Sequence, residues 1–154
     1  MSEPTTTTTT AVAPKSDNKS RMSLMLKQDQ IKSKFDQALN EASGPFIASI
    51  TEIYASDSYL SVCEPGLVVQ EALKAAILKL PILKSLGFAY IVPYKKNGAS
   101  IPQFQIGYKG YIQLAMRTGQ YKTINADIVY EGELREVNKL AGTIAFDGRS
   151  EGVV

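Results

Sequence analysis

Residues 88–119 read FAYIVPYKKNGASIPQFQIGYKGYIQLAMRTG, and they carry the clearest local structure signals in the chain. Within them, residues 88–94 and 102–106 are rich in aromatic and β-branched side chains, which favour strands. Asn97 and Gly98 stand between these two runs, and an Asn-Gly pair in that position is a strong signal for a two-residue turn. The sequence therefore predicts a β-hairpin.

Two prolines limit the backbone hydrogen bonds that this hairpin can form. Pro93 and Pro102 each lack a backbone N–H, so parts of the hairpin must be an edge or unpaired. The strands of such a hairpin are therefore not expected to be fully buried in the centre of a sheet. We therefore expect one or two of its rings, which belong to Tyr90, Tyr94 and Phe104, to be exposed.

The segments after the hairpin alternate between helical and strand patterns. Residues 108–118 have helical spacing, and Gly119 stands where a left-handed C-terminal cap belongs. Residues 121–130 then have the alternating pattern of a strand. A turn is expected at 131–133, and residues 141–146 are expected to pair back.

Three helices are predicted before the hairpin. Apolar residues recur at helical spacing in residues 28–39, 45–54 and 65–80, and Pro81 is expected to end the third helix. The fold class is therefore α+β, with N-terminal helices followed by a β-hairpin–helix–strand core.

The N-terminal segment differs in composition from the rest of the chain. Residues 1–23 contain a threonine run followed by polar residues, with almost no apolar content, so we expect a disordered low-complexity tail. A chain of 154 residues is compatible with one domain. We assign that domain to residues 24–154.

Composition excludes several kinds of site. The chain has no histidine, which removes histidine-based catalysis and most zinc sites. Cys63 is the one cysteine, so neither an internal disulfide nor a cysteine-rich metal site can form, as suits a reducing cytoplasm. No signal peptide or membrane span is read from the sequence.

The charge distribution is uneven although the net charge is only +2. No Asp or Glu occurs from residue 72 to residue 126. The same stretch contains Lys74, Lys79, Lys84, Lys95, Lys96, Lys109, Arg117 and Lys122. Such asymmetry indicates an anionic partner, and the alternative is chance clustering on a solvated face.

One basic row is predicted on the helix at 108–118. Lys109, Gln113 and Arg117 recur at i, i+4 and i+8, so they share one side at a spacing of roughly 6 Å. This row can follow the phosphates of an extended single strand, and Lys122 and Asn125 can prolong it. The alternative is an ordinary solvent face.

The hairpin adds aromatic residues to this basic surface. Lys95 and Lys96 lie near its tip, and cations interleaved with rings are typical of sequence-tolerant single-strand binding. Tyr94, Phe104 and Tyr111 are the candidates for base stacking. The alternative places these rings in the core.

A metal-dependent nuclease is the rival enzymatic hypothesis. Asp127, Glu131 and Glu133 lie near one predicted strand end, and clustered carboxylates can hold magnesium. The alternative is a solvated strand end and turn.

Several blocks of the sequence resemble the RecT family of phage and prophage single-strand annealing recombinases. The most specific is IGYKGYIQLA at 106–115, which follows AYIVPY at 89–94. RTGQY at 117–121, VYEGE at 129–133 and CEP at 63–65 extend the likeness. The resemblance covers most of the chain after the N-terminal tail.

This resemblance implies ATP-independent annealing of complementary strands in phage-type homologous recombination, and hence a protein that is not an enzyme. It also implies an α+β core typical of annealing proteins, homo-oligomeric rings or helical filaments, and a bacterial cytoplasmic location. The implied partners are single-stranded DNA, the annealed duplex intermediate, a phage exonuclease and single-strand-binding protein. No resident cofactor is implied, although magnesium can modulate annealing.

The resemblance also assigns the candidate residues to a DNA site. It puts Lys109, Gln113, Arg117, Lys122 and Asn125 in or near the DNA groove, and it makes the hairpin with Lys95 and Lys96 a clamp. Family members are normally longer, so we expect a chain truncated at its C-terminus. A remnant that no longer binds DNA is the corresponding alternative.

Overall fold

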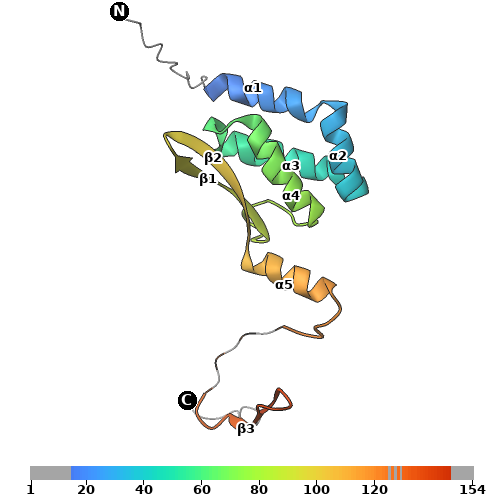
Figure 1. The fold of residues 1–154 in the computed structure, drawn as a ribbon, viewed down its shortest axis with the longest axis vertical. Helices are drawn as coiled ribbons and strands as arrows, with labels where there is room; N and C mark the ends of the chain where they lie inside the picture. Colours follow the sequence, from blue (N-terminus) through green and yellow to red (C-terminus); the bar gives the residue numbers. More distant parts are fainter. Residues whose placement is uncertain (1–14, 125, 127, 129, 147–154) are drawn as a thin grey trace, which may run out of the picture. The chain divides into compact units, whose positions relative to one another are not determined.

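A computed structural model describes residues 15–124, 126, 128 and 130–146 (Figure 1). The chain divides into two compact units, the first ending at Gln120 and the second beginning at Tyr121. The fold class is α+β, as predicted. Whether residues 24–154 act as one annealing domain stays a prediction.

Six helical segments precede the hairpin in the described part of the chain. They are α1 (Lys15–Leu26), α2 (Asp29–Leu39), the 3-10 helix η1 (Asn40–Ala42), α3 (Ser43–Ser56), the 3-10 helix η2 (Leu60–Val62) and α4 (Pro65–Ile77). The three predicted helices are confirmed as α2, α3 and α4. Apolar side chains of the helical segments meet in one core, whose largest fully buried side chains include Tyr54, Phe35, Met22, Ile50 and Leu60.

The predicted disordered tail at 1–23 is wrong for residues 15–23, which belong to α1. Residues 1–14 lie outside the described residues. Asn18, Met22 and Leu26 recur every four residues along α1 and are all buried. Most other residues of α1 are polar, so the composition of the segment hides this buried stripe. The end of the disordered tail was therefore predicted too late in the sequence.

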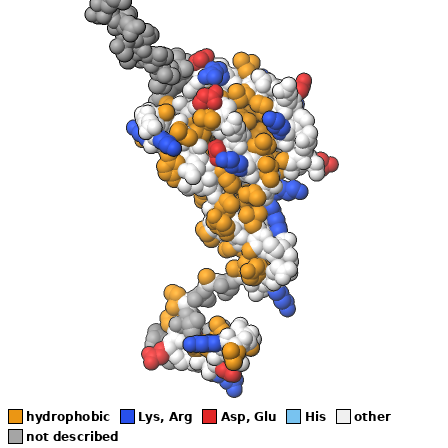
Figure 2. Space-filling view, in the orientation of Figure 1, with side chains coloured by type: hydrophobic (Ala, Val, Ile, Leu, Met, Phe, Trp, Pro, Cys, Tyr) orange, Lys and Arg blue, Asp and Glu red, His pale blue; other side chains and the backbone are white. Residues whose placement is uncertain are grey.

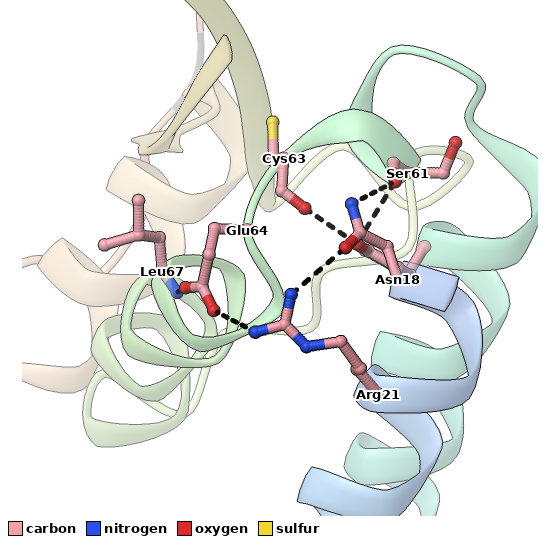
Figure 3. Close-up of polar contacts among 7 residues, drawn as sticks. Asn18, Arg21, Ser61, Cys63, Glu64 and Leu67 are labelled. Atoms are coloured by element: carbon pink, nitrogen blue, oxygen red, sulfur yellow. Dashed lines mark hydrogen bonds and ion pairs between the residues drawn. The ribbon is translucent and has the colours of Figure 1, made fainter. Parts of the chain in front are cut away.

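Polar contacts fix α1 to the start of α4 (Figure 3). Asn18 Nδ2 donates to the Ser61 carbonyl oxygen at 3.5 Å, and Arg21 donates to Asn18 Oδ1 at 3.4 Å. Arg21 also pairs with Glu64 Oε1 at 3.3 Å. The other carboxylate oxygen of Glu64 caps α4 by accepting the Leu67 N–H at 3.0 Å. One carboxylate therefore serves both helices.

Tyr54 completes this connection from within the core. Its hydroxyl donates to the carbonyl oxygens of Cys63 at 2.7 Å and Ser61 at 3.2 Å. Burial, reinforced by the Cys63 and Glu64 charges, raises the pKa of Tyr54 to about 12. The phenol therefore stays protonated and keeps donating at neutral pH.

Helix α4 ends at Ile77, three residues before the predicted end at residue 80. The Leu80 N–H bonds the Ala75 carbonyl at 3.0 Å and the Lys79 N–H bonds the Ala76 carbonyl at 2.9 Å, which is a Schellman motif. Lys79 adopts φ +53° to form it. The local backbone, rather than Pro81, therefore sets the end of the helix.

Replacing Lys79 by glycine is expected to stabilise the protein by about 0.5–1 kcal/mol, because glycine adopts a positive φ without the Cβ penalty. Thermal unfolding followed by circular dichroism measures the change. Lys74→Gly, at an exposed position inside α4, is the control and should destabilise by about 1 kcal/mol. Equal destabilisation by both changes would contradict this reading of the helix end.

The predicted hairpin is confirmed. Strands β1 (Ala89–Lys96) and β2 (Ala99–Ile106) pair antiparallel around Asn97 and Gly98, whose φ values of 50° and 78° are those of a type I′ turn. Pro93 lies opposite Pro102. Pairs alternate outward from the turn, so this pair exchanges no ladder bonds and neither proline breaks the hairpin.

Helix α4 covers one side of the hairpin (Figure 1). Ala89, Ile91 and Pro102 are buried there, and Phe104 packs partly buried against the same core. The outward N–H of Phe104 donates to Glu71 Oε2 on α4 at 2.9 Å. This bond occupies a free donor on the edge of β2.

Helix α5 (Tyr108–Arg117) and its glycine cap are also as predicted, with Gly119 at φ +70°. It follows β2 after a single residue, Gly107. Within the described residues, no helix has the length and apolar character that crossing a bilayer requires.

The second unit differs from its prediction. Its described residues from 121 to 130 form no strand, so the strand predicted there is wrong for them. The predicted turn at 131–133 is present. The predicted strand at 141–146 forms as β4 (Thr143–Phe146), but it pairs with β3 (Leu134–Asn138).

A local turn explains this choice of partner. Asn138 Oδ1 accepts the N–H groups of Leu140 at 3.1 Å and Ala141 at 2.9 Å. Such a side-chain bond stabilises a turn immediately after β3 and returns the chain onto it. The short local pairing therefore replaces the longer one expected from the strand pattern.

Candidate nucleic-acid interface

The hairpin has one packed face and one open face. Ladder pairing and strand alternation place eight side chains on the face away from the core, and we call this set the open face. Its members are Tyr90, Val92, Tyr94, Lys96, Ala99, Ile101, Gln103 and Gln105. None is fully buried and none is acidic, so the open face presents rings, amides and a cation.

Tyr94 has a defined position on the open face. Its ring is 45% exposed. Gln105 Nε2 donates to its hydroxyl at 2.5 Å, which draws the ring back along the hairpin because Gln105 lies opposite Tyr90. A ring that is held in place and half exposed can stack on a base at little entropic cost.

Tyr90 joins the open face to α5. A Cβ on Gly107 would lie 3.0 Å from Tyr90 Cε2, so the ring covers that glycine. A Cβ on Gly87 would lie 3.5 Å from both the Tyr90 hydroxyl and Lys109 Cδ. The Tyr90 hydroxyl and the stem of Lys109 therefore both border Gly87, at the base of the hairpin.

Two glycines allow α5 to start so close to the strands. A Cβ on Gly107 would overlap the Gly87 carbonyl oxygen, and a Cβ on Gly110 would overlap the Phe88 carbonyl oxygen. Only glycine permits this approach. The glycine spacing of the Ile-Gly-Tyr-Lys-Gly block is therefore required for packing.

The residues between and after these glycines point outward. Tyr108 is 71% exposed and Tyr111 is 62% exposed, and Lys109 is exposed between them. Ile112 and Met116 continue the same exposed side of α5. Figure 2 shows hydrophobic side chains gathered over α5 on the visible face. The first turn of α5 thus adds rings and a cation to the base of the open face.

The predicted row on α5 lies on one side of the helix, but its members have different surroundings. Lys109 is exposed, whereas Gln113 is half-buried and its Oε1 finds no hydrogen-bond donor among the described residues. The Arg117 guanidinium donates to the carbonyl oxygens of Leu78 at 2.6 Å and Lys79 at 2.9 Å. The row therefore lies against the segment that connects α4 to β1.

The remaining predicted residues are described one by one. Lys95 and Lys96 are both exposed near the hairpin tip, but Lys95 alternates to the other face. Phe104 is on the packed face, against the core. Lys122 is exposed in the second unit, and Asn125 lies outside the described residues.

Two described lysines, Lys74 and Lys84, form ion pairs, and the cations near the open face are among the lysines that do not. Lys96 and Lys109 form no ion pair within the described part of the chain, whereas Lys84 pairs with Asp57 at 2.6 Å. Partial burial alone would raise the pKa of Asp57, but hydrogen bonds from Lys84 and two backbone N–H groups outweigh it and lower the pKa. Lys96 and Lys109 remain available to an anion.

Some members of the open face were missing from the predicted site. Tyr90, Gln103 and Gln105 were not among the candidates, although the Asn-Gly turn already fixes the pairing. Counting outward from that turn puts Tyr90 opposite Gln105 and Phe104 opposite Ile91. The alternation of strand faces could therefore have added Tyr90 and moved Phe104 to the core.

The described carboxylates of the nuclease hypothesis do not form a metal-binding cluster. Asp127 lies outside the described residues, and Glu133 Oε2 accepts the Tyr130 N–H at 2.9 Å within the turn. Across the residues that the structure describes, no group of three or more acidic or cysteine side chains is arranged to hold a metal ion.

Comparisons with known proteins agree with the resemblance seen in the sequence. The model of the RecT family matches residues 44–153. The uncharacterized protein YqaK of Bacillus subtilis is 45% identical over 123 residues, which are 80% of this chain and 42% of YqaK. Protein RecT of Escherichia coli is 35% identical over 78 residues, which are 48% of this chain and 29% of that protein.

The chain thus spans less than half the length of these two relatives. The family match nevertheless covers the hairpin, the Ile-Gly-Tyr-Lys-Gly block and α5, which together carry the candidate interface. The chain belongs to the RecT family.

Proposed function

We propose that the protein binds single-stranded DNA on the open face and the first turn of α5, and that it anneals complementary strands without nucleotide hydrolysis. One observation carries the proposal. Tyr90, Tyr94 and Lys96 share a face that continues to Lys109, with no acidic side chain on that face. Rings and unpaired cations arranged together suit a strand of bases and phosphates.

The dimensions of the hairpin support this mode of binding. Tyr90 and Lys96 are six positions apart along β1, which corresponds to about 20 Å. That length accommodates a few nucleotides of an extended single strand. Lys96 and Lys109 then contact phosphates near the two ends, and Tyr90 and Tyr94 offer ring surface between them.

This chemistry is indifferent to base sequence. Lysine contacts to phosphates read no base edge, and every base has a face that can stack on a ring. An annealing protein needs that indifference because it must accept any strand. It must also release base edges for pairing, which contacts to phosphates permit.

Family membership supports a role in single-strand annealing recombination. We extend this to homo-oligomeric assembly on DNA, and to a phage exonuclease and single-strand-binding protein as partners. We also infer that the protein catalyses no covalent step and works in the bacterial cytoplasm, with magnesium as a modulator.

An annealing assay separates this function from the nuclease alternative. Two complementary labelled strands are mixed with the protein, with and without magnesium, and analysed on native and denaturing gels. We expect duplex to form faster than without protein, with strand lengths unchanged. Shortened strands in magnesium would favour the nuclease, and no acceleration would contradict annealing by this chain.

A further inference from the structure

Arg117 makes an unusual connection between two helices. Its guanidinium donates to the carbonyl oxygens of Leu78 and Lys79, at 2.6 Å and 2.9 Å. These carbonyls follow the last turn of α4, where a helix leaves acceptors without intrahelical donors. The planar fork of arginine can bond two adjacent oxygens at once, which a lysine ammonium cannot do with the same geometry.

The other end of α5 is fixed to the same connecting segment. Gly107 and Gly110 bring the first turn against the carbonyl oxygens of Gly87 and Phe88. Both ends of α5 are therefore attached to residues 78–88, which connect α4 to β1.

These two attachments define how α5 is rotated about its axis. Gly110, Leu114 and Arg117 fall on the attached side of the helix, and Leu114 packs against the core. Tyr108 falls on the opposite side of the helix, and Tyr111 lies on an exposed flank. Any rotation of α5 would move Lys109 and these rings relative to the open face.

We propose that Arg117 is a positioning residue that fixes α5, and that it contributes to DNA binding through Lys109, Tyr108 and Tyr111 rather than by contacting phosphate. This inference rests on the proposed function for its effect on DNA. It replaces the phosphate contact expected for Arg117 from the charge pattern alone.

Two substitutions separate positioning from phosphate contact. Arg117→Lys keeps the charge but loses the fork, and Arg117→Gln loses both. We expect both to weaken binding of a labelled oligothymidine strand by a similar factor, roughly tenfold. The slope of log affinity against log salt should be the same in the two variants, because Arg117 itself contacts no phosphate in this proposal. Lys109→Gln, the matched comparison, should reduce that slope by about 0.7.

Hydrogen exchange gives a readout that does not depend on DNA. Both Arg117 variants should exchange faster than wild type at the amides of residues 112–118 and 78–80, while α2 stays protected. Wild-type affinity for Arg117→Lys, together with a slope reduced by about 0.7 for Arg117→Gln, would overturn the proposal in favour of a phosphate contact.

The same experiments distinguish failure of this inference from failure of the proposed function. If the wild-type protein binds no single strand, the proposed function is wrong, and exchange at 112–118 still decides whether Arg117 holds α5. Unchanged exchange in both variants would show that Arg117 does not fix the helix.

Discussion

Replacing Gly110 by alanine is expected to destabilise the first unit by about 3 kcal/mol, because the packing leaves no space for the new methyl group. It would overlap the Phe88 carbonyl oxygen and lie 2.8 Å from Ile106 Cγ2. The oxygen is a backbone atom next to β1, so relief requires α5 to move away from the hairpin. We expect the DNA interface to be lost together with stability.

Chemical denaturation measures this effect. The chain has eight tyrosines and no tryptophan, so circular dichroism and tyrosine fluorescence are suitable probes. Gly44→Ala is the matched control, since nothing lies within 4 Å of a Cβ at that helical position. It should change stability by less than about 1 kcal/mol, because reduced unfolded-state entropy is opposed by the preference imposed by Pro45. Similar stabilities for the two variants would contradict the close approach described for Gly110.

Removing Lys96, on the open face, together with Lys109, in the first turn of α5, is expected to have the largest effect on DNA binding. Lys96→Gln with Lys109→Gln should reduce the salt slope by about 1.4, since each phosphate contact to a single strand contributes about 0.7. Affinity at moderate salt should fall by roughly tenfold or more. Both side chains are exposed, so the fold should be unaffected.

The control for charge must remove two lysines elsewhere. Lys27→Gln with Lys32→Gln alters net charge equally at exposed positions near and on α2, which packs on α1, α3 and α4. We expect this variant to keep nearly the wild-type slope. Equal losses from the two pairs would mean that overall charge, rather than the open face, governs binding.

Local signals in the sequence were sufficient for the hairpin and for most helices. The turn at Asn97 and Gly98 needs two residues with positive φ, and these two residue types adopt it readily. Gly119 likewise marks the end of α5. Such features depend on a few neighbouring residues, so their prediction requires no knowledge of the tertiary fold.

Features that depend on distant partners were not predicted. Helix α1 is stabilised by burial of Met22 and Leu26 and by contacts to residues 61–64, which its polar composition does not reveal. The strand pattern at 121–130 could not show that β4 would pair with the nearer segment β3 instead.

The candidate site shows the same limit. Helical spacing correctly put Lys109 and Arg117 on one side of α5, but it could not show what that side faces. The carbonyl oxygens of Leu78 and Lys79 are nearly forty residues away in sequence, and their distances from Arg117 emerge only in the fold. A charge pattern therefore indicated a surface, while packing decides which charges remain free.

The most direct test of the central claim is fluorescence anisotropy of a labelled single strand, titrated with the wild-type protein and the Lys96/Lys109 variant across a salt series. We predict wild-type binding that weakens steeply as salt rises, and a variant slope smaller by about 1.4. Absence of wild-type binding at low salt from a folded chain, or identical slopes for the two proteins, would contradict a DNA interface on the open face.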